Sequence, residues 1–373
     1  MVWWQPGRRS LPSCASKRSI RPTSMCRQCP HSQPQRREIV MQTFENKPKA
    51  TTPMSSESAA TIQEEFDQNG YVIVEGLLDV HRDLQPILDD YAHLLDQLAV
   101  RWFGEGKLPS TYAELPFNRR ASAVISQIGN EESYHLDISL PKIAVYGAET
   151  PIHTSAAVFN LLTHPRLLDV VELLIGPEIY SNPIQHARIK PPEAAVPPGA
   201  PGNGYLSATP WHQDQGVITA DADETDILSV WIAITDATEE NGCLCMIPGS
   251  HREGLAPHCF EIPQKFRAAH VTPLPMKAGS VVFFHRLTKH ASLPNQSDDI
   301  RFSFDLRYSP LGLPTGRDEF PGFVARSRQH PEAVLTDHRQ WAALWEGARA
   351  RLVERGEVVF GSRWRGVQQP DCA

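Results

Sequence analysis

The strongest constraint on the fold comes from residues 205–310, where short runs of β-branched and aromatic residues dominate. Turn residues separate these runs, among them Asn241-Gly242 and Pro294-Asn295. The runs read ILSVWIAIT, CLCMIP, SVVFFH and IRFSFDLRY. Several short strands with turn-rich spacing are typical of a β-barrel or a β-sandwich. This part of the chain therefore predicts a β core.

Helical patterns lie on both sides of this β core. Residues 58–70 predict a short helix that ends at Asn69-Gly70, and YVIVEGLL predicts a strand after it. A long amphipathic helix follows, with Pro86 in its first turn, and residues 110–175 are predicted to be mostly helical. A C-terminal helix is predicted from the apolar stripe of Trp341, Leu344, Trp345, Ala348 and Leu352. We therefore expect an α+β protein in which flanking helices brace a β barrel.

The N-terminal segment differs in composition from the rest of the chain. Residues 1–40 contain eight Lys and Arg residues but one acidic residue, and they are rich in Arg and Ser. Such a composition is typical of a transit peptide. We therefore expect residues 1–57 to be a disordered or targeting-like tail, for which mitochondrial targeting stays open. Residues 58–373 are expected to form a single catalytic domain.

Charge and cysteine content limit the partners and the compartment. The residues after position 40 include 28 basic and 42 acidic side chains, and so acidic a body argues against nucleic-acid binding. No apolar run is long enough to span a membrane as a helix. The seven cysteines lack the spacing of a disulfide framework, which favours reduced thiols and an intracellular, cytoplasmic location.

The stretch PWHQDQG, residues 210–216, contains a candidate metal-binding pair. In an extended segment, His212 and Asp214 point to the same side because side chains alternate along a strand. Imidazole and carboxylate together suit iron, manganese or zinc. An H-x-D pair often arises by chance, so a third ligand from another strand is required. The histidines of the β region that compete for this role are His251, His258, His270, His285 and His290.

The run RFSFDLRY alternates strictly between polar and apolar residues. Its polar face consists of Arg301, Ser303, Asp305 and Arg307. If this face is interior, an arginine on it needs an anionic partner. A small dicarboxylate would serve, because a guanidinium group binds a carboxylate through two parallel hydrogen bonds. The alternative is that Arg301 forms an ion pair with Asp305 or Asp298 on a solvent-exposed face, and the spacing does not decide between the two.

Two histidines, one carboxylate and an arginine for a dicarboxylate describe a facial-triad iron site. Three protein ligands occupy one face of the metal, and the opposite face stays open for a chelating cosubstrate and oxygen. Beyond these four residues, the chain resembles the phytanoyl-CoA dioxygenase family of iron(II)- and 2-oxoglutarate-dependent oxygenases over residues 60–310. The matching segments, in the family's order, are FDQNGYVIVEGLLD, IQHARIKPP, WHQDQG, SVWIAITDATEENGCLCMIPGSH and AGSVVFFHRLTKHASLPNQSDDIRFSFDLRY.

The resemblance implies a fold and a set of site residues. The fold would be a double-stranded β-helix, which is a jelly-roll, cupin-like barrel. His212, Asp214 and His290 would be the metal ligands and the catalytic centre. Arg301 would bind the distal carboxylate of 2-oxoglutarate, assisted by Ser303. The further cosubstrate-binding residues would be Ser292, Trp231 and His186, the last of which lies four positions before Lys190.

The resemblance also implies an activity. With Fe(2+), 2-oxoglutarate and O2, the enzyme would hydroxylate a C–H bond of a small molecule and release succinate and CO2. Asp214 favours oxygenation over halogenation, because related iron halogenases have a small residue at this position. The alternatives are a cupin-like metal enzyme that does not use 2-oxoglutarate, such as an isomerase, and a catalytically degenerate binding protein. Neither a membrane nor a nucleic acid is expected as a partner, and the oligomeric state is open.

The substrate itself is not implied. The sequence contains no obvious cluster of Lys and Arg near the β core apart from Arg119-Arg120, and an acyl-CoA would require a basic rim. The acyl-CoA substrate of the family name is therefore not carried over, and the substrate stays open between an acyl-CoA and a small metabolite or secondary-metabolite precursor. The Pro- and Gly-rich loop over residues 191–204 and the segment 106–150 are expected to shape the substrate pocket.

Overall fold

The computed structural model describes residues 55–196, 206–259, 261–267 and 270–364. The described residues all belong to one compact unit. The expected tail and most of the expected binding loop lie outside the described residues, so the division into a tail over residues 1–57 and one catalytic domain stays a prediction. No helix in the described ranges is long and apolar enough to cross a membrane.

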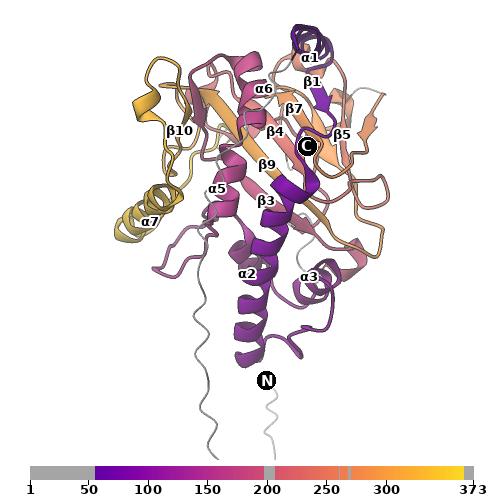
Figure 1. Ribbon diagram of the computed structural model, residues 1–373, viewed down its shortest axis with the longest axis vertical. Coiled ribbons are helices and arrows are strands. Elements are labelled where there is room, and N and C mark those ends of the chain that lie inside the picture. Colours follow the sequence, from indigo (N-terminus) through magenta and orange to yellow (C-terminus); the bar gives the residue numbers. More distant parts are fainter. Residues whose placement is uncertain (1–54, 197–205, 260, 268–269, 365–373) are drawn as a thin grey trace, which may run out of the picture. The chain divides into compact units, whose positions relative to one another are not determined.

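Two antiparallel sheets form the centre of the fold (Figure 1). The larger sheet follows the order β1 (Tyr71–Val74), β7 (Val281–His285), β4 (Leu228–Ala233), β9 (Arg301–Pro310), β2 (Ile179–Ser181) and β10 (Phe323–Arg326), with β3 (His186–Lys190) also paired to β9. The smaller sheet follows the order β6 (Thr272–Leu274), β5 (Leu244–Met246) and β8 (His290–Ser292). The predicted combination of helices with a β core is confirmed as a mixed helix and antiparallel-sheet fold.

The helices precede and follow the strands in the chain. They are α1 (Ser56–Asn69), α2 (Gln85–Gly104), α3 (Phe117–Ile125), α4 (Asn130–Ser133), α5 (Ala156–Leu162), α6 (Pro165–Ile175) and α7 (His338–Arg355). Gly70 closes α1 in the left-handed conformation, and Pro86 lies in the first turn of α2, both as predicted. The prediction that residues 110–175 are mostly helical is wrong for 137–155, where Pro141 and Pro151 interrupt helical hydrogen bonding.

Strand β9 joins the helical layer to the site. Figure 1 shows α2, α5 and α6 lying across one face of the larger sheet. On that face the ring of Tyr91 in α2 contacts the rings of Phe302 and Phe304, at centroid distances of 4.8 and 6.0 Å. Each buried phenylalanine contributes about 1.5–3 kcal/mol. A shift of one residue in register would turn this apolar face to the other side, so the packing also fixes which way Arg301 and its polar neighbours point.

Two further predictions require correction. In α7, Trp341, Trp345 and Ala348 are buried as expected, but Leu344 is 39% exposed because it lies at the edge of the apolar stripe. Among the cysteines, Cys243 is a buried free thiol, as is Cys245. Cys259, in contrast, is disulfide-bonded, so the prediction of reduced thiols is wrong for it.

Candidate metal centre

The H-x-D segment lies directly beside strand β8. His212 and His290 exchange both backbone hydrogen bonds, each with an N–O distance of 2.9 Å, as a hydrogen-bonded antiparallel pair does. Their rings therefore lie side by side, with centroids 4.1 Å apart. This pairing explains how residues 78 positions apart in the sequence come to share one site.

Asp214 completes the cluster. Suitable ligand atoms of His212, Asp214 and His290 all lie within 4.8 Å of one another, and within the described ranges no other group of three His, Cys, Asp or Glu residues has this geometry. Nε2 of His212 is 3.7 Å from Oδ1 of Asp214. The three residues named from the sequence are thus brought together at one point, largely screened from solvent.

Both histidine rings are oriented by backbone carbonyls. Nδ1 of His212 is 2.8 Å from the oxygen of Pro210, and Nδ1 of His290 is 3.0 Å from the oxygen of Thr288. Since a carbonyl can only accept, each Nδ1 donates the hydrogen, which leaves each Nε2 as the ring nitrogen available to a metal. Burial, with a contribution from His290, lowers the pKa of His212 to about 3, so its ring is neutral at pH 7.

Gln213 holds the H-x-D segment in position. Its backbone is extended, at φ −118° and ψ 140°, which puts the flanking His and Asp on one side although Asp214 begins a 3-10 turn. Its side chain points the other way and bonds the oxygens of Gly254 and Leu287 at 2.8 and 2.7 Å. Gly216 is required nearby, since a Cβ there would lie 2.2 Å from the ring of His258.

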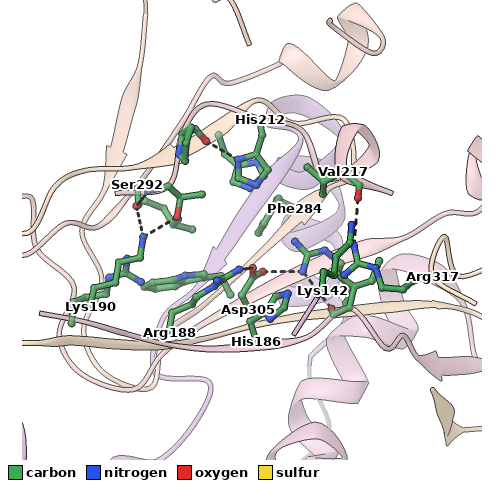
Figure 2. Close-up of a pocket in the computed structure, with 18 of the residues that line it drawn as sticks. Lys142, His186, Arg188, Lys190, His212, Val217, Phe284, Ser292, Asp305 and Arg317 are labelled. Atoms are coloured by element: carbon green, nitrogen blue, oxygen red, sulfur yellow. Dashed lines mark hydrogen bonds and ion pairs between the residues drawn. The ribbon is translucent and has the colours of Figure 1, made fainter. Parts of the chain in front are cut away.

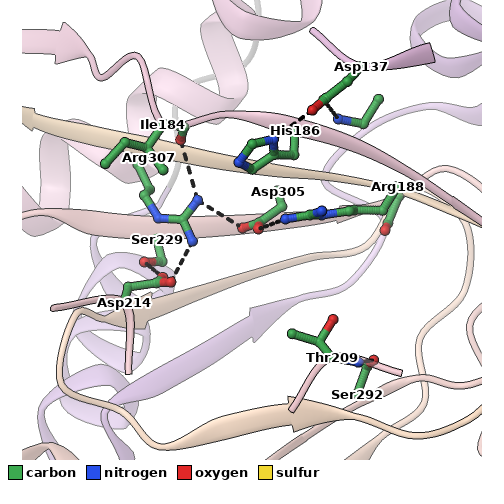
Figure 3. Close-up of polar contacts among 12 residues, drawn as sticks. Asp137, Ile184, His186, Arg188, Thr209, Asp214, Ser229, Ser292, Asp305 and Arg307 are labelled. Atoms are coloured by element: carbon green, nitrogen blue, oxygen red, sulfur yellow. Dashed lines mark hydrogen bonds and ion pairs between the residues drawn. The ribbon is translucent and has the colours of Figure 1, made fainter. Parts of the chain in front are cut away.

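A chain of charges supports Asp214, as Figure 3 shows. Arg307 donates to Oδ1 of Asp214 at 2.5 Å, and the hydroxyl of Ser229 donates to Oδ2. Arg307 also lies 3.4 Å from Asp305, which in turn lies 3.8 Å from Arg188. Although burial opposes it, the Arg307 guanidinium holds the pKa of the Asp214 carboxyl below its usual range, so the candidate ligand is anionic.

The sequence analysis did not assign a role to Arg307. The signal was available, since Arg307 lies on the same polar face of the strand as Arg301. The sequence does not show the register of β4 and β9. In that register Ser229 faces Arg307, and the pairing places both residues beneath Asp214.

The other candidate histidines lie outside the metal cluster. His258 accepts a hydrogen bond from the backbone N–H of Gln213 at 2.8 Å, so it supports the segment from behind. His285 lies at the end of β7, with its ring 5.4 Å from that of His251. His270 is exposed. Of the histidines left open by spacing, His290 alone joins the cluster.

We expect His285 to make the metal-free protein sensitive to acid. Burial, with help from Arg286 and His251, lowers the pKa of His285 to about 4, against about 6.5 in an unfolded chain. Because the pKa of His285 is lower in the folded protein than in the unfolded chain, protonation of this ring favours unfolding. The stability that the neutral ring contributes is therefore present above pH 6.5 and is lost as the pH falls toward 4. Urea unfolding of the metal-free protein should give a free energy of unfolding lower by about 2 kcal/mol at pH 5 than at pH 7 from this group.

The variant His285→Asn is the control for this effect, because it keeps a hydrogen-bond acceptor for the N–H of Leu287, which donates to Nδ1 of His285 at 3.1 Å. Its stability should change less between pH 7 and pH 5 than that of the wild type. Equal pH dependence in the two proteins would contradict the assignment to His285.

A pocket of about 380 Å³ opens beside the cluster, and residues of both sheets line it (Figure 2). Arg301, on β9, is 1% exposed and donates to Oγ of Ser303 at 2.6 Å, while its Nε has no partner. Its guanidinium carbon lies 5.4 Å from the centre of the Trp231 ring. Ser303 therefore holds the Arg301 guanidinium group from the same strand face.

Lys190 is a second buried cation at this end of the pocket. It faces Arg301 directly across β3 and β9, and its Nζ bonds the hydroxyls of Thr209 and Ser292 at 2.8 and 3.0 Å. Like charges directly opposite each other on paired strands are destabilising. Burial and, after it, Arg301 lower the pKa of Lys190 well below its usual range.

No carboxylate of the described residues pairs with either of these two cations. Asp305 is engaged by Arg307 and Arg188, and Asp298 lies 2.8 Å from Arg119. The alternative in which Arg301 forms an ion pair with Asp305 or Asp298 is therefore wrong. Burial lowers the pKa of Arg301 to about 10. An anion at this end of the pocket would relieve both the burial cost and the repulsion.

His186 and Trp231 complete the set named from the sequence, and both line the pocket. Nδ1 of His186 lies 2.8 Å from Asp137, and the residue faces Asp305 across β3 and β9. Along the paired strands, His186 therefore lies closer to Asp305 and its ion pairs than to Arg301.

The expectation that no cluster of Lys and Arg lies near the β core is wrong. The described residues that line the pocket include six cations, Lys142, Arg188, Lys190, Arg301, Arg307 and Arg317, and one carboxylate, Asp305. The pair suggested by the sequence is not among them. Arg119 bonds Asp298, and Arg120 bonds Asp96.

Comparisons with known proteins find both a matching family and similar individual proteins. The family model for phytanoyl-CoA dioxygenase (PhyH) matches residues 66–303. Over 170 residues the chain is 31% identical to a probable phytanoyl-CoA dioxygenase of Caenorhabditis elegans, a match that covers 41% of this chain and 50% of that protein. Over 207 residues it is 28% identical to 1-deoxypentalenic acid 11-beta-hydroxylase of Streptomyces arenae, covering 50% of this chain and 69% of that protein.

Among solved structures, the apo form of the non-heme monooxygenase ThoJ is 21% identical, with a TM-score of 0.47, and the match covers 79% of this chain and 98% of that one. The chain spans about half the length of the nematode relative.

Proposed function

This chain belongs to the phytanoyl-CoA dioxygenase family, and from that premise we propose that it is an iron(II)- and 2-oxoglutarate-dependent oxygenase that hydroxylates a C–H bond of a small molecule. The observation that carries the proposal is the juxtaposition of two elements in one pocket. One is the His212, Asp214 and His290 cluster. The other is the buried Arg301 and Lys190 pair, which no carboxylate of the described residues neutralises.

The cluster fits an iron(II) ion. Two imidazoles, each with Nδ1 bonded to a carbonyl, would offer Nε2 to the metal, and one ionised carboxylate would supply the third ligand, which is the donor set of a facial triad. The carbonyls of Pro210 and Thr288 keep the two rings in the ligating orientation. Asp214 would fill the position that would otherwise admit a halide, so oxygenation is favoured over halogenation.

The cationic end of the pocket fits 2-oxoglutarate. Arg301 would bind its distal carboxylate, with Ser303 fixing the guanidinium and Trp231 beneath it. Ser292 would lie beside the cosubstrate. Lys190 would add a second charge, a role that the sequence analysis did not assign. Bound iron(II) would activate O2, which is the oxidant, and 2-oxoglutarate would supply two electrons as it is converted to succinate and CO2.

The protein would then serve mainly to orient and to exclude water. Arg307 and Ser229 would hold the Asp214 carboxylate in one geometry, and the apolar walls, which include Phe284 and Leu244, would limit water around the reacting C–H bond. Hydroxylation as the outcome is supported by the hydroxylase named among the relatives.

We also infer that the two sheets form the double-stranded β-helix, or jelly roll, that the resemblance implies. In support of this, the larger sheet contributes Trp231 and Arg301 to the pocket, and the smaller sheet contributes His290 and Ser292. The site would thus lie between the sheets, as it does in barrels that hold a small ligand.

The proposal predicts slow turnover of 2-oxoglutarate even without a primary substrate. Purified protein with iron(II), ascorbate and O2 should convert 2-oxoglutarate to succinate, measured by mass spectrometry, and Asp214→Ala should abolish this conversion. Arg328→Ala is the matched control, since Arg328 is exposed and bonds Glu172 on the surface. If wild type and Asp214→Ala form succinate equally fast, the oxygenase proposal fails.

A further inference from the structure

The pocket has a second cationic end, on the far side of the metal cluster from the cosubstrate residues. Figure 2 shows Lys190 and Ser292 at one end and Lys142 and Arg317 at the other, with His212 between the two ends. All five side chains line the same cavity. A ligand at the second end would therefore reach the metal cluster from the side opposite to 2-oxoglutarate.

The charges of the pocket are only partly accounted for by the proposed function. Arg188 and Arg307 lie beside Asp305, and Arg307 also pairs with Asp214. The pair of Arg301 and Lys190 suits the cosubstrate. At the second end two further cations, Lys142 and Arg317, line the wall.

Lys142 lies at the mouth of this end. It is exposed, and no carboxylate of the described residues forms an ion pair with it, although its Nζ lies 5.5 Å from the centre of the Phe360 ring. Surrounding protein and the nearby Arg317 lower the pKa of Lys142 to about 8, while Glu319 opposes them. The ammonium group therefore lies near a cation, Arg317, and near an acid, Glu319, which does not form an ion pair with it.

Arg317 is held deeper in the wall. It is 7% exposed, and its Nη2 donates to the oxygen of Val217 at 3.4 Å. The preceding Gly316 has a φ of +74°, and a Cβ there would lie 2.7 Å from Ile218, so the turn that carries Arg317 packs tightly on the 3-10 segment that follows Asp214. The guanidinium group is therefore fixed in relation to the metal cluster.

Resting on the proposed function, we propose that the primary substrate carries a carboxylate or phosphate group that binds to Lys142 and Arg317. Its reactive C–H bond would then lie between this anchor and the metal cluster. Two cations set beside each other at a partly enclosed wall form a complementary site for an anion. A pocket of about 380 Å³ suits a small ligand rather than a bulky one.

Binding to the protein loaded with Mn(II) and saturating 2-oxoglutarate tests this inference, because manganese does not support turnover and the cosubstrate blocks the first cationic end. The probes are hexanoate, hexyl phosphate and neutral hexanol, measured by calorimetry. At least one anionic probe should bind about tenfold more tightly than hexanol, and the tighter of the two identifies the anion. Lys142→Gln and Arg317→Gln should each weaken its binding about tenfold.

The controls separate this inference from the proposed function. Lys277→Gln alters an exposed lysine that pairs with Asp236 away from the pocket, and it should bind every probe as the wild type does. Each variant's affinity for 2-oxoglutarate reports whether the fold and the first end are intact, and Lys142 is exposed enough to be replaced without disturbing the core. Equal binding of hexanol and both anions, or anion binding unchanged in Lys142→Gln, overturns the inference alone. A wild type that does not bind 2-oxoglutarate overturns the proposed function.

Discussion

Replacing Arg301 with glutamine should lower the affinity for 2-oxoglutarate by about a hundredfold or more. Arg301 is buried, is held by Ser303, and faces no carboxylate among the described residues. Glutamine removes the charge and the two-pronged geometry, and the loss of one partner from a buried charge pair costs about 2–5 kcal/mol. Calorimetric titration of the Mn(II)-loaded protein with 2-oxoglutarate measures the effect.

Two further variants sharpen this test. Arg301→Lys should bind 2-oxoglutarate with intermediate affinity, because lysine restores the charge but not the planar fork. Arg328→Gln replaces an exposed arginine and should leave the affinity unchanged. Wild-type affinity in Arg301→Gln would show that the dicarboxylate binds elsewhere.

Replacing Asp214 with alanine should abolish metal binding and also destabilise the metal-free protein. The carboxylate is the anionic member of the candidate ligand set, so its loss should weaken Mn(II) binding beyond detection. It also neutralises Arg307, which is 4% exposed. Without Asp214, the guanidinium group of Arg307 would keep one carboxylate partner, Asp305, at 3.4 Å. Removing one partner of a buried ion pair costs about 3–5 kcal/mol, which urea unfolding of the metal-free variant would register.

A double variant distinguishes the two roles of Asp214. In Asp214→Ala with Arg307→Met, no unpaired guanidinium remains, so much of the lost stability should return, while metal binding should not. Asp226→Ala is the matched carboxylate control, because Asp226 is exposed and pairs with Arg286 at the surface. Mn(II) binding at wild-type affinity in Asp214→Ala would rule out the cluster as the metal site.

Local patterns predicted the elements of this protein well. Strict alternation in RFSFDLRY fixes both faces of β9, because the side-chain period of a strand is two. Gly70 and Pro86 mark helix boundaries through their own backbone limits. The segment 137–155 was wrongly predicted to be helical, because Pro141 and Pro151 within it interrupt helical hydrogen bonding.

The metal cluster could be named from the sequence because its members stand in recognisable segments. Spacing alone left five histidines as candidates for the third ligand, and the resemblance selected His290. The physical reason for that choice lies in the backbone pairing of His212 with His290, which a sequence does not display. The partners that orient the rings, Pro210 and Thr288, are main-chain oxygens and leave no residue-type signal.

By itself the sequence determined the β core, the helices that brace it and the polar face of β9. These features depend on the spacing of apolar and polar residues within short segments, which the sequence displays directly. Only the tertiary structure decided the charge of the pocket. Lys142, Lys190 and Arg317 come from three separated segments, in a body whose overall charge is acidic. Composition averages charge over the whole chain, whereas a ligand meets only the groups that folding gathers around one cavity.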